Sequence, residues 1–432
     1  MLCMNEKFLH YIWQNKLFEA HSLQTTDGQK VEVIDVGRLN TDAGPDFFNA
    51  KLKIDDTLWA GNVEIHINAS DWIKHKHHTN KVYDSVILHV VQNEDAPIYR
   101  LNGELIPQIT LNYPVEIEQR YESLLANKKW IACEGKLKQV DDLFIHSWLT
   151  ACLTERLSNK TETIFRLLDQ NKNNWEEAFY ITLARNFGFG TNSDVFERLA
   201  KSLPLSCLGK HKDNLFQIEA LLFGQSGLLF SSKKKADEYQ LSLEKEYRFL
   251  QAKFELKPID GSLWKLLRLR PSNFPHVRLA QFASLVHNSS KLFSKIIENP
   301  EFEVIETLFE CNTSEYWTTH YLFGEESTSR SKKLGKSAIH VILINTVVPF
   351  IFCYGKSKQN EELQETALNL LEKIPAERNS VIDGWQGVGI KACSAFDSQS
   401  LLQLKKCYCD DKKCLQCRIG HKVLSKKVNS LF

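Results

Sequence analysis

Residues Asn62–Ile67 read NVEIHI, and this alternation of apolar and polar side chains decides the fold at the N-terminal end of the chain. Successive side chains of a β-strand point to opposite faces of a sheet. Val63 and Ile65 therefore face the core, while Glu64 and His66 share the other face. The pattern predicts a strand that carries two potential ligands on one side.

Further short runs that are typical of strands lie on both sides of this one, at residues 31–36, 50–54, 85–91 and 106–111. Apolar residues at helical spacing predict an opening helix over residues 5–20. A polar, helix-compatible segment, Ser70–Tyr83, interrupts the strands and begins with a residue that suits a helix N-cap. This order of helix, three strands, helix and strands predicts a small mixed α/β sheet domain over residues 1–113.

Beyond residue 113 the patterns are mainly helical. A chain of 432 residues also exceeds the ~250–300 residues that one core usually serves. We therefore expect an α+β protein with a long, mainly α-helical region over residues 114–400, in one or two domains. A C-terminal segment, residues 401–432, carries a cluster of cysteines.

The bulk composition excludes some classes of protein. With 54 basic and 53 acidic residues, the formal net charge of +1 gives no global field for nucleic acid or an acidic membrane, so any polyanion site must be local. The N-terminus has no secretory signal pattern. The most apolar stretch, residues 338–354, is shorter than the ~20 residues that span a bilayer and predicts a buried helix or strand. We expect a cytoplasmic protein without a membrane partner.

Asp46 is the third candidate ligand beside Glu64 and His66. It ends a turn-rich loop, Gly44-Pro45-Asp46, directly before a predicted strand. Two carboxylates on neighbouring strands offer hard oxygen ligands for Mg²⁺ or Mn²⁺, and the histidine adds a group that binds or activates water. The alternative is a solvent-facing sheet surface with unrelated polar residues.

Three more histidines gather close by in the sequence. His75 and His77 lie in the predicted helix, and His89 lies in the apolar strand VILHVV. A polar side chain inside an apolar strand costs free energy unless it is paired. The partner of His89 is either a backbone carbonyl or the proposed site.

The Asp46, Glu64 and His66 set, together with the order of elements, resembles the PD-(D/E)XK nuclease superfamily over about residues 5–95. In that superfamily an Asp, an acidic residue and a Lys two positions later sit on adjacent strands of an αβββαβ core. The resemblance implies a restriction-endonuclease-like domain that hydrolyses phosphodiesters of DNA or RNA with Mg²⁺ or Mn²⁺. His66 occupies the Lys position, where it can do part of the lysine's task or ligate the metal. Glu19, at the end of the first helix, is a candidate for the extra carboxylate that some members have.

Two other functions compete with a nuclease. One is a non-catalytic nucleic-acid-binding or interaction protein on a degenerate nuclease fold, in which His66 marks lost chemistry. The other is a helical interaction scaffold with a purely structural N-terminal domain. Geometry separates them, because a nuclease needs the carboxylates of Asp46 and Glu64 to converge within reach of one metal ion.

Two basic stretches in the helical region are candidates for contacts with nucleic acid, although charge runs are usually solvated surface. Their predicted binding residues are Arg268, Arg270, Arg278, Lys332 and Lys333.

The C-terminal cysteines follow the spacing C-x-C-x4-C-x2-C, at Cys407, Cys409, Cys414 and Cys417. Four thiolates this close can enclose Zn²⁺ or hold an iron–sulfur cluster, and zinc is the preferred reading over the cluster and over free thiols. The first pair is tighter than usual for zinc. Cys407 is therefore a candidate bystander, with His421 or Cys393 as the replacement ligand.

Several phrases of the sequence, among them GRLNTDAGPDF, GNVEIH, DSVILHVV and YCDDKKCLQCRIG, resemble an uncharacterised bacterial family known only as a domain of unknown function. The resemblance extends over essentially all 432 residues and implies no activity.

Overall fold

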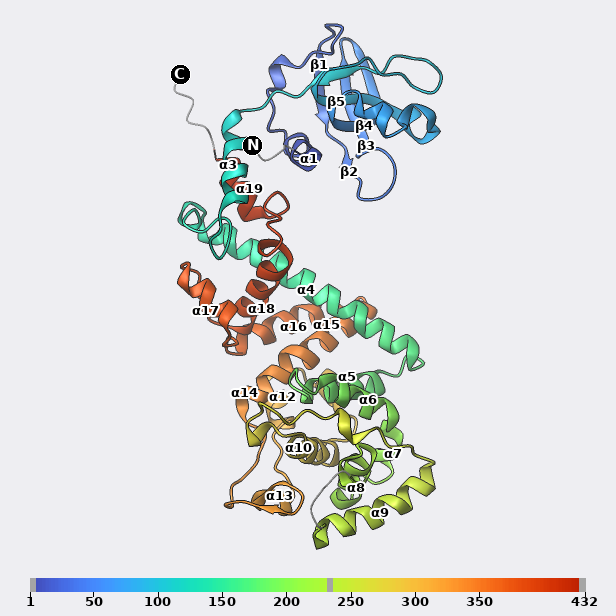
Figure 1. The fold of residues 1–432 in the computed structure, drawn as a ribbon, viewed down its shortest axis with the longest axis vertical. Coiled ribbons are helices and arrows are strands. Elements are labelled where there is room, and N and C mark those ends of the chain that lie inside the picture. The colour runs from blue at the N-terminus through green and yellow to red at the C-terminus, as the bar shows by residue number, and fades with distance from the viewer. Residues whose placement is uncertain (1–4, 231–235, 427–432) are drawn as a thin grey trace. The chain divides into compact units, whose positions relative to one another are not determined.

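The computed structural model describes residues 5–230 and 236–426 (Figure 1). The chain divides into two compact units, one of Met1–Trp148 with Leu404–Phe432 and one of Leu149–Gln403. A mixed sheet lies in the N-terminal part, and the rest is mainly helical. The predicted α+β class is confirmed.

The sheet of the first unit has the strand order β1-β3-β4-β5-β6, with β2 paired to β3. Strand β4 pairs antiparallel with β3 and parallel with β5, which pairs parallel with β6. Each strand predicted from the sequence has a counterpart whose ends differ by a few residues. The strands are β1 (Val31–Asp35), β2 (Arg38–Leu39), β3 (Phe47–Ile54), β4 (Thr57–Asn68), β5 (Val86–Asn93) and β6 (Gln108–Thr110).

Helix α1 (Glu6–Gln14) packs against β4. The side chain of Asn5 accepts the backbone N–H of Phe8 at 3.1 Å and caps the helix, and Ile12 and Trp13 on its inner face are fully buried. The predicted helix ends early, at Gln14, and a short 3-10 turn, η1 (Ala20–Ser22), follows it. Residues 6 and 10 lie one turn apart near the start of α1.

The helix predicted over Ser70–Tyr83 is wrong beyond its first turn. The segment folds as α2 (Asp71–Lys74) and two 3-10 turns, η2 (His77–Thr79) and η3 (Lys81–Ser85). Lys76 has φ = 60°, a left-handed conformation that stops an α-helix. The hydroxyl of Ser70 donates to Asp95 at 2.6 Å and does not cap the helix.

The C-terminal segment belongs to the first unit and does not stand alone. It contains the π-helical turn η9 (Lys405–Cys409) and α19 (Arg418–Leu424), which packs against α3 (Val115–Ala126). The guanidinium of Arg120 donates to the Leu424 carbonyl oxygen at 3.0 Å. The turn η4 (Leu137–Gln139) and the start of α4 (Asp142–Gln170) complete this unit.

The second unit is a helical body around one large apolar core, with a small hairpin of β7 (His320–Leu322) and β8 (Glu325–Glu326). Its helices after α4 are α5 (Trp175–Phe187), α6 (Ser193–Ser202), α7 (Leu205–Gly209), α8 (Leu215–Gln225), α9 (Glu238–Phe254), α10 (Pro275–Asn288), α11 (Leu292–Glu298), α12 (Phe302–Leu308), α13 (Tyr316–Thr319), α14 (Lys336–Ile342), α15 (Val348–Ser357), α16 (Glu361–Lys373), α17 (Ser380–Gly387) and α18 (Ala395–Leu404).

One helix of the described residues is long and apolar enough to cross a membrane by length and composition alone. It spans Lys336–Ser357, where α14 and α15 are joined by the π-helical turn η8 (Leu343–Val347). In the protein, 72% of its apolar window is buried, and the core helix of a soluble protein passes the same test. The apolar stretch predicted to be a buried helix or strand is thus a mostly buried helix.

Candidate functional site

Asp46 and Glu64 converge at the start of the β3–β4 hairpin. Pairing of Phe47 with Val63 brings the residue before β3 next to the second half of β4. The backbone N–H of Asp46 donates to Glu64 Oε2 at 3.1 Å, and the backbone N–H of Ile65 donates to Asp46 Oδ2 at 2.9 Å. These bonds fix both carboxylates beside the paired ends of β3 and β4.

A row of polar side chains crosses the three parallel strands beside these carboxylates. The register places Glu64 opposite His89 and His89 opposite Gln108. His89 Nδ1 lies 3.1 Å from Gln108 Oε1, and His89 Nε2 lies 2.8 Å from His66 Nδ1. The partners that His89 needs inside its apolar strand are thus side chains on the same face of the sheet.

This row determines which nitrogen of His66 carries a proton. The amide oxygen of Gln108 can only accept, so His89 donates from Nδ1 and keeps a lone pair on Nε2. His66 then donates from Nδ1 and presents the lone pair of Nε2 away from the row. Burial lowers the pKa of His89 to about 4 and, with the neighbouring histidines, that of His66 to about 2, so both rings are neutral.

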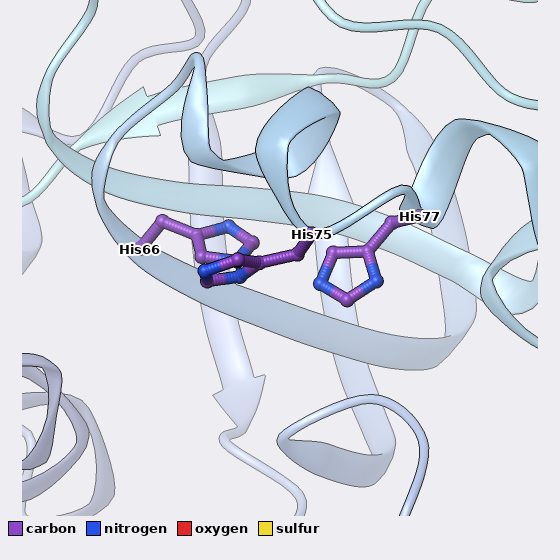
Figure 2. A group of neighbouring side chains, drawn as sticks. All are labelled: His66, His75 and His77. Carbon is purple, nitrogen blue, oxygen red and sulfur yellow. Dashed lines mark hydrogen bonds between the residues drawn. The ribbon is translucent and has the colours of Figure 1, made fainter.

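His75 and His77 lie beside His66 on the side of its Nε2 atom (Figure 2). His66 Nε2 lies 3.0 Å from His75 Nδ1, and the three rings offer ligand atoms that all lie within 4.8 Å of one another. Glu64 Oε1 adjoins this group, 3.2 Å from His77 Nε2 and 3.6 Å from His66 Nε2. His66 is buried and His75 is exposed, so the group reaches from the sheet to the surface.

The break after α2 is what brings His75 and His77 together. In a continuous helix, residues two apart point about 200° away from each other, since each residue turns the chain by roughly 100°. The left-handed Lys76 between them ends the helix, and both rings lie within reach of His66. Tyr83 then stacks on His77, with ring centroids 3.8 Å apart, and Trp72 meets His77 edge-on.

Several of the donor atoms lie at the spacing of ligands around one metal ion. Metal–nitrogen bonds of about 2.0–2.1 Å give a tetrahedral edge of roughly 3.4 Å. The separations of 3.0, 3.2 and 3.6 Å among His66, His75, His77 and Glu64 bracket that value. Imidazoles suit Zn²⁺ and similar ions, while carboxylates suit Mg²⁺ and Mn²⁺. The residues therefore fit a divalent cation, and the nitrogen-rich set disfavours Mg²⁺.

Helix α1 contributes two residues that the sequence reasoning missed. His10 Nε2 lies 3.2 Å from Asp46 Oδ2, and this buried atom has no hydrogen-bond partner among the described residues. Burial raises the pKa of Glu6, and both His75 and Asp46 act on it electrostatically. The signal in the sequence was the four-residue spacing of Glu6 and His10, which places them on one face of α1.

The charge state of Glu64 is consistent with a cation site. Burial, followed by repulsion from Asp46, raises the pKa of Glu64 to about 9. Without a cation the carboxyl group is therefore protonated near neutral pH, and a positive ion between the two acids would favour its ionised form.

Glu19 was predicted as an accessory carboxylate at the end of the first helix. It follows the end of α1 and is exposed, and its backbone N–H donates to the Asn112 carbonyl oxygen at 3.0 Å. Glu6, at the other end of the helix, interacts electrostatically with His75 and Asp46.

The predicted nucleic-acid-binding residues divide into two groups. Arg278 donates to Asn273 at 2.6 Å and to Gln281 at 2.9 Å and stacks on Phe189, while Lys332 is buried and donates to the Thr318 carbonyl oxygen at 2.8 Å. Arg268, Arg270 and Lys333 are exposed.

The predicted metal-binding cysteines and their suggested replacement ligands fall into two groups. Cys409, Cys414 and Cys417 interact with one another electrostatically, and Cys133 joins them. His421 Nδ1 lies 3.0 Å from the Tyr11 hydroxyl, and Cys393 is exposed in the second unit.

Comparison with known proteins gives a family and no activity. No curated protein and no solved structure matches the chain. A family described as "Protein of unknown function (DUF2851)" matches residues 6–380, which include the whole sheet with its histidine group and most of the helical unit. The chain therefore belongs to the DUF2851 family of proteins of unknown function.

Proposed function

We propose that this protein is a metal-dependent phosphodiesterase, a nuclease of the PD-(D/E)XK type that acts on DNA or RNA. The observation that carries the proposal is the convergence of Asp46 and Glu64 with the histidine group at one end of the β3–β4 hairpin. A structural sheet surface has no need to gather three imidazoles and the Glu64 carboxylate at ligand spacing, with a second carboxylate, Asp46, beside them.

The cation would be held by His66, His75 and His77, with Glu64 and Asp46 beside them. Nitrogen donors favour Mn²⁺ or Zn²⁺ over Mg²⁺, which prefers an all-oxygen shell. A bound cation of this kind lowers the pKa of water and neutralises charge on a phosphate. The exposed position of His75 leaves the site accessible to a substrate.

His66 in this proposal is a ligand and not a proton acceptor. Its Nδ1–H is donated to His89, and its Nε2 points at His75 and Glu64. A histidine with a pKa of about 2 is a weak base but a good neutral ligand. It thus replaces the usual lysine by taking part in metal binding. His10 is a further imidazole beside the site, with its Nε2 3.2 Å from Asp46 Oδ2.

Phosphodiesterase activity is tested with full-length protein on single- and double-stranded DNA and RNA in Mn²⁺, Zn²⁺ or Mg²⁺. We expect cleavage that Asp46→Asn and Glu64→Gln each reduce by at least about 10²-fold, since a loss of roughly 3 kcal/mol of transition-state stabilisation has that effect. Asp56→Asn is the matched control, because Asp56 lies in the exposed turn at the far end of the same hairpin. Its cleavage rate should equal that of the unmodified protein.

Cleavage that survives Asp46→Asn would overturn the assignment. If no form of DNA or RNA is cleaved with any of the three ions while the metal still binds, the non-catalytic binding protein becomes the better description. His66→Lys tests the lineage, because it restores the superfamily's usual residue on β4. We expect this variant to lose affinity for Zn²⁺ and to keep cleavage in Mg²⁺ or Mn²⁺.

A further inference from the structure

Four cysteines from two distant parts of the sequence gather in the first unit. The thiol of Cys409 lies within electrostatic range of the other three, and Cys133 interacts with both Cys414 and Cys417. Cys414 and Cys417 are each 8% exposed. We call this group the thiol cluster; its members are Cys133, Cys409, Cys414 and Cys417.

Contacts around the thiol cluster tie the loop after α3 to the C-terminal segment. The ammonium group of Lys412 donates to the Leu125 carbonyl oxygen, and Lys405 lies over the Trp130 ring, 5.0 Å from its centroid. Asn127 donates to the Ala132 carbonyl oxygen at 2.8 Å and so shapes the loop just before Cys133. The approach of Cys133 to the C-terminal cysteines is therefore supported by packing on both sides.

The backbone turn after Cys414 is built around sulfur. The N–H groups of Ile419 and Gly420 both donate to the thiol of Cys417. Gly420 has to be glycine, because a Cβ there would lie 2.1 Å from the Cys414 carbonyl oxygen. The two N–H donors fix the position of the Cys417 sulfur within this turn.

We infer that the thiol cluster is a four-sulfur Zn²⁺ site that fastens the C-terminal segment to the loop after α3. Four soft donors in a closed arrangement are the ligand set of structural zinc. The histidine group is the one set among the described residues whose ligand atoms all lie within 4.8 Å of one another, so zinc has to draw the sulfur atoms closer. Binding of the ion is coupled to this local rearrangement.

This ligand set differs from the one expected from spacing alone. Cys407 is left out, and the fourth ligand is Cys133 in place of His421 or Cys393. Because the whole second unit lies between Cys133 and Cys409 in the sequence, the ion closes the discontinuous first unit.

The site is tested by replacing zinc with Co²⁺ in the full-length protein. Sulfur ligands give an intense thiolate-to-cobalt charge-transfer band, which the histidine and carboxylate donors near β4 cannot produce. We expect the band in the unmodified protein and in Cys407→Ser, and a clear loss of its intensity in Cys133→Ser. An unchanged band in Cys133→Ser, or a band lost in Cys407→Ser, would overturn the ligand set.

Thiol alkylation followed by mass spectrometry gives a second test that needs no variant. In the zinc-loaded protein, Cys393 and Cys407 should react first, while the thiol cluster reacts as one group and only after a chelator is added. Early reaction of Cys133, in step with Cys393, would contradict the inference. Iron and visible absorption in the purified protein would also overturn it, because they indicate an iron–sulfur cluster.

Discussion

His66 Nδ1 lies 2.8 Å from His89 Nε2, and this contact orients the one histidine of strand β4 that faces the candidate metal site. His89 is in turn held by Gln108 on β6. A ligand whose other ring nitrogen is fixed by hydrogen bonds is already oriented for binding, which strengthens metal affinity. The parallel pairing of β4, β5 and β6 therefore does more than build the sheet, since it aligns a ligand with its support.

Removal of an imidazole from the histidine group should weaken metal binding strongly. We expect His75→Ala and His77→Ala each to lower the affinity for Mn²⁺ and Zn²⁺ by more than the roughly 10–100-fold typical of losing an outer-shell partner. Isothermal titration calorimetry of protein with the thiol cluster already zinc-loaded measures this. His78→Ala is the matched control, because His78 neighbours His77 in the sequence but lies outside the group. Equal losses in all three variants would show that the segment, and not the ligands, matters.

The Gln108–His89–His66 row should act by positioning. Gln108→Leu removes the acceptor for His89 Nδ1–H, so the proton of His66 is no longer confined to Nδ1. We expect metal affinity to fall about 10–100-fold, the usual effect of losing such a partner. Gln108→Glu keeps an acceptor and should retain affinity. Nitrogen NMR of His66 should show a single tautomer in the unmodified protein and a mixture in Gln108→Leu; one tautomer in both would contradict this role.

The strand assignment and the shared face of Glu64 and His66 could be predicted because alternation along a strand is a local property. Two parts of the site could not be predicted in this way. The turn at Lys76 adopts a positive φ that few non-glycine residues favour, so propensity alone indicates a helix through His75 and His77. The sequence also did not identify Glu6 and His10 as site residues, because the packing of α1 on β4 is a tertiary contact.

The proposed thiol cluster was also only partly predictable, because its members come from two parts of the chain that are far apart in the sequence. Spacing within residues 407–417 predicts a cysteine metal site but cannot name Cys133, which we propose as its fourth ligand. The first unit includes a segment from the other end of the chain. A local sequence pattern cannot show that two segments so far apart in the sequence belong to one compact unit.

Exposed and internal arginines of the second unit should differ in their effect on nucleic-acid binding. If Arg268 and Arg270 contact phosphates, each Arg→Ala change should reduce the slope of log affinity against log salt by about 0.9 on duplex DNA. Arg278→Ala should instead lower the melting temperature and leave the slope unchanged, because Arg278 is bound to Asn273 and Gln281 inside the protein. Filter binding at several salt concentrations tests both. Slopes that are unchanged in Arg268→Ala and Arg270→Ala would remove these residues from the binding surface.

Glu219 in α8 should make the second unit less stable as pH rises. This carboxyl is 1% exposed and accepts hydrogen bonds from the hydroxyls of Ser314, at 2.9 and 3.1 Å, and Tyr239. Burial raises its pKa from 4.5 to about 7. Between these two values the folded state binds the proton more tightly than the unfolded state, so stability falls as pH increases through this window. The shift corresponds to about 3 kcal/mol between the two ends.

Glu219→Gln keeps the hydrogen-bond acceptor and removes the titration. In urea unfolding of the full-length protein at pH 4, 5, 6, 7 and 8, we expect the variant to gain stability relative to the unmodified protein as pH rises, by about 3 kcal/mol over the range. Glu365→Gln, a change at an exposed position on α16, is the control and should leave the pH profile unchanged. Because both units contain charged groups, only the difference between profiles reports on Glu219. Parallel profiles for Glu219→Gln and the unmodified protein would mean that the folded state does not raise the proton affinity of Glu219.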